Sequence, residues 1–313
     1  MDVVDVRASD FKLSPPISNT IRVKLEAASF RLGLEIFMKM GSIIHFRFRP
    51  DGFVMMVMPS TIIRKGVKEV EGTPRQQSVG EYVFKKGNLL RYKYRVNSLN
   101  GQEYPHHDTS LYLKDMVSRV GDVKKDYISF RVRIGDFATD DAGIEINTQG
   151  SGGVKNVPTI KPPSAYPGLL QYSRFYDGVD PHGKIAPNIF LGAATTTKKS
   201  QVPVLEFRRY RKTGNIHLCA WPLSGDPDPV CSEPLDGDLS NSEYEIDENI
   251  GQGFGIRKII LKQNEWIHKM PKLSKSVIQI YIDSENPLAP LCLCTFLGTQ
   301  ATAAFYISNI NIS

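Results

Sequence analysis

Short runs of β-branched and aromatic residues, each bounded by turn-forming residues, recur along the whole chain and limit it to a fold built mainly from antiparallel sheet. The clearest pair is residues 43–48 and 53–58, which are separated by Arg49-Pro50-Asp51-Gly52. Asp-Gly between two apolar runs is a strong hairpin signal. Both halves are therefore predicted to be rich in strands, with further runs at residues 87–96, 127–134, 202–210, 216–221, 256–262, 277–283, 289–296 and 303–310.

Four short segments have helical periodicity instead, at residues 27–40, 109–120, 187–195 and 262–270. The first has one apolar face and a second stripe that carries Arg31, Glu35 and Lys39. The second segment follows Asp108, a favourable N-cap residue, and the fourth is expected to stop at Pro271. Each helix is thus predicted to bury one face and to keep charged residues in water.

The length of 313 residues is enough for two domains of ordinary size. Residues 147–168 read NTQGSGGVKNVPTIKPPSAYPG, a flexible glycine-rich part followed by a proline-rich, extended part. The order of predicted strands and helices is the same on both sides of this segment. We therefore predict an α+β protein with an N-terminal extension (1–9), a first domain (10–149), a linker (150–166) and a second domain (167–313).

Composition excludes several classes of protein. The longest apolar stretches are about ten residues, shorter than the roughly 18 to 20 that a membrane-spanning helix needs. The first ten residues contain four charged side chains and no apolar run, so no secretory signal is predicted. Four cysteines without a C-x-x-C pair indicate a reducing, intracellular compartment and no metal site.

No catalytic motif supports an enzyme, and no cofactor is predicted. Lys212-Thr213-Gly214 has the wrong order for a phosphate-binding loop, and Gly251-x-Gly253-x-Gly255 precedes a strand where a dinucleotide site needs a helix. The six histidines lie outside any G-x-S-x-G or reactive-cysteine context. These patterns favour a binding protein.

Several segments together resemble the sliding-clamp family, the eukaryotic and viral relatives of proliferating cell nuclear antigen. The resemblance covers most of the chain in topology and is carried by residues 21–59, 108–132 and 254–290 and by the last strand, Ala304-Phe305-Tyr306-Ile307. The chain departs from cellular clamps in its net charge of +6 and in its tail, which is neither acidic nor proline-containing. These departures favour a viral or fast-evolving member that acts in the nucleus or at a viral replication site in the host cell.

The resemblance implies two topologically similar clamp domains, with antiparallel sheets outside and short helices on the DNA-facing side. It also implies a DNA polymerase processivity factor, which binds or encircles double-stranded DNA and tethers DNA polymerase and other replication proteins. A protein that moves along a duplex without reading its sequence contacts phosphates through Lys and Arg. The candidate DNA-binding residues are Arg31, Lys39, Lys114, Arg119, Lys124, Lys125, Lys184, Lys198, Lys199, Lys262 and Lys269. A further basic cluster, Arg208, Arg209, Arg211 and Lys212, lies on a strand and turn, where it is either a second phosphate contact or charge that protects an edge.

Two protein interfaces are also implied. Client proteins of the family insert a hydrophobic-aromatic motif beneath the interdomain linker, and the matching residues are Val157, Ile160, Pro162, Tyr166, Phe305 and Ile307. A ring needs head-to-tail contact between two edge strands. One predicted edge is residues 126–134 and the other lies near residues 226–244. The interface residues would be Tyr127, Ser129, Arg131 and Arg133 on one subunit and Glu243 and Glu245 on the next.

A homotrimeric ring is the favoured assembly, and three alternatives differ from it in class. One is a monomeric or dimeric polymerase accessory subunit of the herpesvirus type, which grips DNA by charge. Another is a checkpoint-clamp subunit that assembles with two different partners. The third is a structural viral β-sandwich protein, in which proline- and glycine-rich loops are also common.

Overall fold

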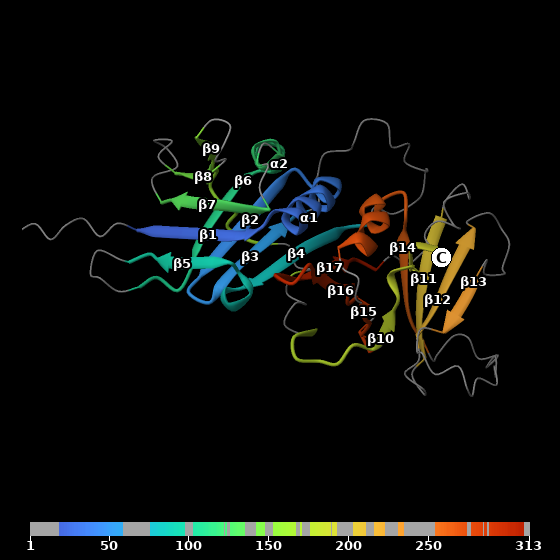
Figure 1. Cartoon of the computed structure of the whole chain (residues 1–313). Coiled ribbons are helices and arrows are strands. Elements are labelled where there is room, and N and C mark those ends of the chain that lie inside the picture. Colours follow the sequence, from blue (N-terminus) through green and yellow to red (C-terminus); the bar gives the residue numbers. More distant parts are fainter. Residues whose placement is uncertain are drawn as a thin grey trace, which may run out of the picture.

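The computed structural model in Figure 1 describes most of the chain. The described residues are 19–58, 76–97, 103–121, 123, 126–134, 142–147, 153–166, 170, 176–188, 190–192, 203–210, 216–222, 231–234, 254–273, 277–283, 285–286 and 288–309. They form three antiparallel sheets accompanied by a few short helices. The predicted fold class is confirmed. None of the described helices combines the length and apolarity that a membrane span requires.

The three sheets contain five, eight and four strands. The first has the order β5 (Arg91–Arg95), β1 (Thr20–Glu26), β7 (Tyr127–Arg133), β8 (Gly143–Asn147) and β9 (Val154–Pro158). The second has the order β10 (Gly183–Ile185), β15 (Ile278–Tyr281), β16 (Leu291–Leu297), β17 (Ala301–Ile307), β4 (Ser78–Lys85), β3 (Gly52–Val57), β2 (Ile43–Arg49) and β6 (His107–Tyr112). The third has the order β13 (Cys231–Pro234), β12 (Ile216–Pro222), β11 (Pro203–Tyr210) and β14 (Phe254–Ile260).

The order of strands repeats between the two halves of the chain. The run β1-β7-β8-β9 in the first half matches β10-β15-β16-β17 in the second, and β4-β3-β2-β6 matches β13-β12-β11-β14. The two halves meet where β17 pairs with β4 inside the eight-stranded sheet. In this comparison β17 is the counterpart of β9, and β4 is the counterpart of β13. The topological duplication predicted from the sequence is therefore present, and its junction is a continuous sheet.

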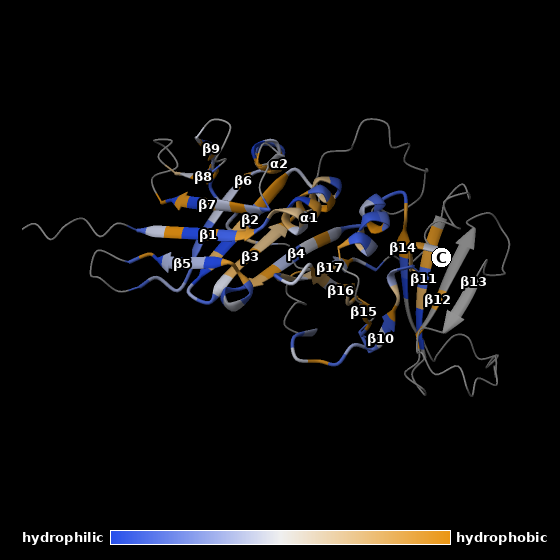
Figure 2. Ribbon diagram, in the orientation of Figure 1, coloured by the Kyte–Doolittle hydropathy of each residue, from blue (hydrophilic) through white to orange (hydrophobic). Residues whose placement is uncertain are grey.

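Apolar and polar residues alternate along many of the strands, so each of these strands buries one face and exposes the other. On β1, Ile21, Val23 and Leu25 are buried while Arg22 between them is exposed, and Figure 2 shows hydrophilic and hydrophobic bands alternating along this strand. The predicted hairpin joins β2 to β3, and it needs a glycine because Gly52 has a φ of 150° and an added Cβ would clash with the carbonyl oxygen of Phe84. Strand β9 lies within the segment predicted as linker, so the connection between the halves begins later than expected.

The helical elements are α1 (Ala27–Met40), η1 (Lys86–Asn88), α2 (Leu113–Gly121) and η4 (Glu265–Lys272). Helix α1 has the predicted bounds. The fourth predicted helix forms a 3₁₀ helix that contains Pro271 rather than stopping before it. Residues 187–188 and 190–192 are helical, as predicted, and residues 193–195 lie outside the described part.

The predicted helix at residues 109–120 is wrong in its first turn. Residues 109–112 continue β6, which pairs with β2, and the helix starts only at Leu113, whose N–H donates to the carbonyl oxygen of Ser42 at 2.9 Å. Asp108 is not an N-cap. Its carboxylate accepts two hydrogen bonds from Arg47 at 2.9 and 2.8 Å. Pairing with a neighbouring strand, which is distant in sequence, outweighs the local capping signal.

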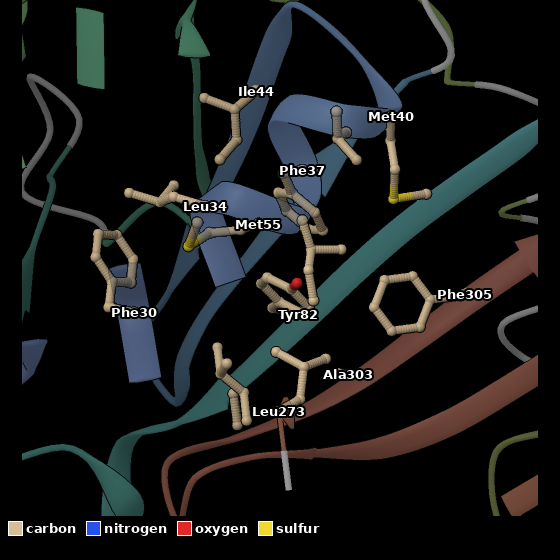
Figure 3. Packing of buried hydrophobic residues seen from close by; sticks show 14 of the residues in the cluster. Phe30, Leu34, Phe37, Met40, Ile44, Met55, Tyr82, Leu273, Ala303 and Phe305 are labelled. Carbon is tan, nitrogen blue, oxygen red and sulfur yellow. The ribbon is translucent and has the colours of Figure 1, made fainter. Parts of the chain in front are cut away.

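A row of packed aromatic side chains, which we call the aromatic chain, fills the junction between the halves. The ring of Tyr82 on β4 stacks on Phe37 of α1 at 4.1 Å and meets Phe305 of β17 edge-on at 6.1 Å, as Figure 3 shows. Phe305 in turn stacks on Trp266 of η4 at 4.6 Å. Large aromatic side chains bury much apolar area each, so this chain is a principal source of packing energy at the junction.

Gln76 links the halves through polar contacts. Its side-chain amide donates to the carbonyl oxygens of Lys258 at 2.6 Å and Ser308 at 2.8 Å. Its side-chain oxygen accepts from the N–H of Ile260 at 2.9 Å and from the amide of Asn264 at 2.8 Å. Every donor and acceptor of this buried amide is satisfied, which is the condition under which a buried polar network stabilises a fold.

Candidate nucleic-acid and partner interfaces

The helices gather on one side of the sheets. Helix α1 lies between α2 and η4, and Figure 1 shows the three in a row. Helix α1 covers the face of the eight-stranded sheet that carries Gly80 and Tyr82, because a Cβ added at Gly80 would lie 2.7 Å from Phe37. We call this the helix face of the sheet and the opposite one the outer face. The predicted separation of helices from an open sheet surface is present in the described residues.

Three of the predicted DNA-binding cations are exposed on or beside the helices. Lys114 and Arg119 are exposed on α2, and Lys262 is exposed in the turn before η4. Arg31 on α1 is half-buried, and its Nε atom is buried without a hydrogen-bond partner among the described residues. We call the surface formed by α2, α1 and η4 the helix row. Its most exposed positive charges therefore lie on α2 and in the turn before η4.

Two predicted DNA-binding lysines have protein partners. The ammonium group of Lys269 on η4 lies 2.9 Å from the carboxylate of Glu35 on α1, and Lys39 on α1 lies 3.7 Å from Glu265 on η4. These reciprocal ion pairs tie α1 to η4 across the junction. Three of these four side chains are exposed and Lys269 is only partly buried, so each pair contributes little to stability. They do lower the positive charge that Lys39 and Lys269 present to a phosphate.

Lys184 is on the wrong face for a helix-side contact. It pairs in register with Gln279, which pairs with Cys294, and paired residues share a face of an antiparallel sheet. That face is the outer one, because neighbouring Ile280 and Leu293 belong to the core on the helix side. The placement of Lys184 among the helix-borne cations is therefore corrected. Four other predicted lysines lie outside the described residues: Lys124, Lys125, Lys198 and Lys199.

The second basic cluster is engaged by the protein itself. On β11, Arg208 forms an ion pair with Glu206, and the guanidinium of Arg209 donates to the carbonyl oxygen of Ile282 at 2.8 Å. Lys258 also lies 3.7 Å from the Glu206 carboxylate. These contacts favour a structural role for Arg208 and Arg209. Arg211 and Lys212 lie outside the described residues.

The segment that follows β9 docks on the outer face of the eight-stranded sheet. The N–H of Ile160 donates to the carbonyl oxygen of Ser110 on β6 at 2.7 Å. The ring of Tyr166 lies 5.9 Å from that of His45 and 5.0 Å from the guanidinium carbon of Arg47. Farther along, Tyr176 packs against the outer face and donates its hydroxyl hydrogen bond to the carbonyl oxygen of Pro290 at 2.9 Å.

Three of the predicted partner-binding residues point into the core. Val157, Phe305 and Ile307 are all at most 1% exposed, and Phe305 is held between Tyr82 and Trp266. Ile160, Pro162 and Tyr166 remain half-buried on the linker. The sequence could not show which face of β17 points outward, because Ala304-Phe305-Tyr306-Ile307 is apolar at both parities. Ala304 and Tyr306 point to the outer face instead, where both are buried in a smaller apolar cluster.

The outer face near β17 holds a group of polar side chains in an apolar setting. Burial raises the pKa of Glu81, whose carboxylate accepts a hydrogen bond from the Tyr306 hydroxyl at 3.4 Å. Burial also raises the pKa of the Cys292 thiol, which lies 3.5 Å from the Sγ atom of Cys294. Among the described residues no group of three or more His, Cys, Asp or Glu side chains is arranged to hold a metal ion.

The prediction that residues 126–134 form a free edge is wrong. Strand β7 pairs with β1 on one side and with β8 on the other. Tyr127, Ser129, Arg131 and Arg133 all lie on the solvent face of the sheet. There the Lys24 ammonium lies 3.7 Å from the centre of the Tyr127 ring, and Arg133 lies 3.4 Å from Glu145. The five-stranded sheet ends at β9 and the four-stranded sheet at β13. Glu243 and Glu245 lie outside the described residues.

Solved structures of sliding clamps have the same arrangement. The PCNA2–PCNA3 complex of Sulfolobus tokodaii aligns over 92% of this chain and 98% of that chain, with a TM-score of 0.57 and 16% identity. The proliferating cell nuclear antigen of Entamoeba histolytica aligns over 93% of this chain and 99% of that chain, with a TM-score of 0.58 and 12% identity. This chain has the sliding-clamp fold. No family model and no curated protein sequence matches it.

Within the clamp fold, His45 is a buried titratable group at the linker contact. Desolvation lowers its pKa to about 4 against a smaller opposing effect of Asp108, and its Nδ1 atom lies 2.6 Å from the Ser110 hydroxyl oxygen. A histidine whose pKa is lowered on folding stabilises the protein above its unfolded pKa of 6.5, and this contribution is lost as the pH falls from 6.5 to about 4.

We therefore expect the wild type to lose about 2 kcal/mol more stability than His45→Gln between pH 7 and pH 5. Urea unfolding of both proteins at the two pH values measures the difference. His107 and His182, whose pKa values burial also lowers, are present in both proteins, so their effects cancel. Parallel pH profiles would show that His45 is not the responsible group.

Proposed function

We propose that the protein is a sliding clamp, a DNA polymerase processivity factor that encircles double-stranded DNA without reading its sequence and tethers replication proteins. The observation that carries the proposal is the repeated strand order: β17 pairs with β4 inside the chain, whereas their counterparts β9 and β13 have no second partner among the described strands. On this proposal the protein is a binding scaffold rather than an enzyme, and it works where DNA is replicated, in the nucleus or at a viral replication site.

The internal junction supports a ring. Strand β17 pairs antiparallel with β4 from Ala301 opposite Phe84 to Ile307 opposite Ser78. The counterparts of these strands, β9 and β13, each lack a second partner among the described strands. If β9 of one copy pairs with β13 of the next, the contact between copies repeats the contact within the chain. A head-to-tail contact of this kind closes into a ring when its rotation allows, and we propose a homotrimer.

Duplex contact is assigned to the exposed cations of the helix row. Reversing Lys114 and Arg119 to glutamate should weaken binding equally for unrelated duplex sequences. It should also reduce the slope of log affinity against log salt by about 2, because each phosphate contact contributes about 0.9. Fluorescence anisotropy with two unrelated duplexes at several salt concentrations measures both effects.

A matched control keeps the same change in net charge. Lys161 and Lys184 are both exposed, on the linker and on the outer face, and reversing this pair should leave duplex affinity within about twofold. Equal losses in the two double variants would mean that overall charge, rather than the helix row, attracts the duplex. A duplex affinity unchanged by Lys114→Glu and Arg119→Glu would move the DNA contact to another surface.

Partner proteins are assigned to the outer face beside the linker. Tyr166 is half-buried there and offers an aromatic ring, a residue type that protein interfaces favour, while the buried rings of Tyr176 and Tyr306 form the apolar layer beneath this surface. DNA polymerase and other replication proteins are the proposed clients. The net charge of +6 keeps one alternative open, an accessory subunit that holds DNA as a monomer or dimer.

A further inference from the structure

The five-stranded sheet has a solvent face that the clamp proposal does not use. Val23 of β1 and Phe130 of β7 are buried on its core side. Because side chains alternate along a strand, their neighbours lie on the other face. The register places Arg22 of β1 directly between Lys93 of β5 and Arg131 of β7. Three cations on adjacent strands thus form one row.

This row belongs to a larger positive surface, which we call the cationic sheet face. Its five members are all exposed, and within the described part of the chain none of them forms an ion pair or a side-chain hydrogen bond: Arg22, Arg91, Lys93, Arg95 and Arg131. Two further cations on the same face do have partners, since Lys24 lies over the Tyr127 ring and Arg133 contacts Glu145.

The protein provides little internal compensation for this charge. Like charges directly opposite each other on neighbouring strands are destabilising, and Arg22 faces a cation on both sides. Glu145 lies opposite Arg131, but its carboxylate contacts Arg133. Glu26, at the end of β1, accepts a hydrogen bond from Ser29 of α1 at 2.8 Å. The row therefore reduces stability unless an external anion binds to it.

The face has the chemistry of a phosphate-backbone contact rather than of a protein interface. None of the exposed large hydrophobic residues in the described part of the chain lies on β5, β1 or β7. Protein interfaces usually have an apolar core, whereas a nucleic-acid backbone needs only positive charge. Four of the five cations are arginines, which pair with phosphate in a bidentate manner.

We propose that the cationic sheet face binds the phosphate backbone of single-stranded nucleic acid, at a site separate from the helix row. Side chains on one face recur about every 6.6 to 6.8 Å along a strand and about 4.7 to 4.9 Å between strands. A flexible single strand can bend to follow this array across a twisted sheet and place successive phosphates on successive cations. A duplex is stiff, so its phosphates cannot rearrange to match the spacing of the cations. The proposal rests on the charge pattern and does not require a closed ring.

The test uses the full-length chain and two triple variants with the same change in net charge. One variant combines Arg22→Glu, Lys93→Glu and Arg131→Glu on the sheet face, and the other combines Lys114→Glu, Arg119→Glu and Lys262→Glu on the helix row. The probes are a short fluorescent oligo(dT) and a fluorescent duplex, titrated by anisotropy at several salt concentrations. Circular dichroism checks that both variants are folded.

The sheet-face variant should lose at least about tenfold in oligo(dT) affinity near 50 mM salt, and its salt slope should fall by about 2, since each single-strand contact contributes about 0.7. The helix-row variant should keep oligo(dT) affinity within about threefold and lose duplex affinity instead. If both variants lose oligo(dT) affinity equally, or if the sheet-face variant keeps it, the proposal is overturned.

Two further measurements keep the test decisive. Polyglutamate added as a competitor should displace oligo(dT) at least about tenfold less effectively than unlabelled oligo(dT), and equal displacement would assign the face to an acidic protein instead. If the reversal variant does not fold, Arg22→Gln, Lys93→Gln and Arg131→Gln remove the same charges without reversing them. This variant should melt no lower than the wild type, because it relieves repulsion, and should still lose oligo(dT) binding.

Discussion

Asn156→Pro is expected to convert the protein from an assembly of about 105 kDa, three times the subunit mass of 35.1 kDa, into a single subunit in light scattering. The reason lies in the edge strand β9. Pro158, which pairs with Gly143 of β8, has no N–H to donate. Its backbone nitrogen must therefore face away from β8, toward the free edge. Since backbone direction alternates along a strand, the N–H of Asn156 also faces this edge.

Proline at position 156 therefore removes a donor that only a neighbouring subunit could use. The matched control is Asn156→Ala, which removes the exposed side chain but keeps the backbone N–H. This variant should keep the mass of the wild-type assembly. Circular dichroism should show that the proline variant retains its sheet content. A proline variant that stays at about 105 kDa would exclude β9 from the interface. A wild type of 35.1 kDa at micromolar concentration would instead favour the monomeric accessory subunit.

Trp266→Ala should lower the free energy of unfolding by about 3 to 5 kcal/mol, the usual loss when a fully buried aromatic residue is truncated. Trp266 is fully buried, and its ring stacks on Phe305 at 4.6 Å. Its indole N–H donates to the side-chain oxygen of Asn264 at 3.3 Å. Removing the ring leaves a cavity beside Phe305, at the end of the aromatic chain that crosses the junction between the halves.

Urea unfolding monitored by far-ultraviolet circular dichroism measures this loss. Leu288→Ala is the matched control, because Leu288 is 81% exposed and its truncation should change stability by less than about 0.5 kcal/mol. Trp266→Phe, which keeps an apolar ring, should recover a large part of the loss. A Trp266→Ala protein within about 1 kcal/mol of the wild type would show that the junction does not depend on this packing.

The sequence predicted the elements whose signal is local. Helix α1 was found with its observed bounds, because its apolar spacing and its charged stripe both have the helical period. The hairpin from β2 to β3 was found because Asp51-Gly52 lies between two apolar runs. Strand β7 was found because its polar and apolar residues alternate. In each case a few neighbouring residues contain the whole pattern.

Features that depend on residues distant in sequence, such as strand edges and buried faces, were predicted less well. Strands β8 and β9 lie beside or within a segment rich in glycine and proline, so β7 was mistaken for an edge. Residues 109–112 follow a good N-cap residue, yet they form a strand because β2 offers them a partner. The sequence did not show which residues of β17 point to the core. Phe305 was therefore expected at a surface, but it lies in the core. Lys39 and Lys269 were predicted to face DNA, and each also has an acidic partner on the neighbouring helix.

The sequence by itself determined the antiparallel, strand-rich class, the two repeated halves and the basic net charge, since these follow from composition and short-range periodicity. Only the tertiary structure decided which strands are edges, which face of β17 meets the core and which cations are free. Arg22, Lys93 and Arg131 lie far apart in the sequence and become neighbours only when β5, β1 and β7 pair. The physical reason is that strand pairing is set by contacts between residues distant in sequence, and no local pattern encodes them.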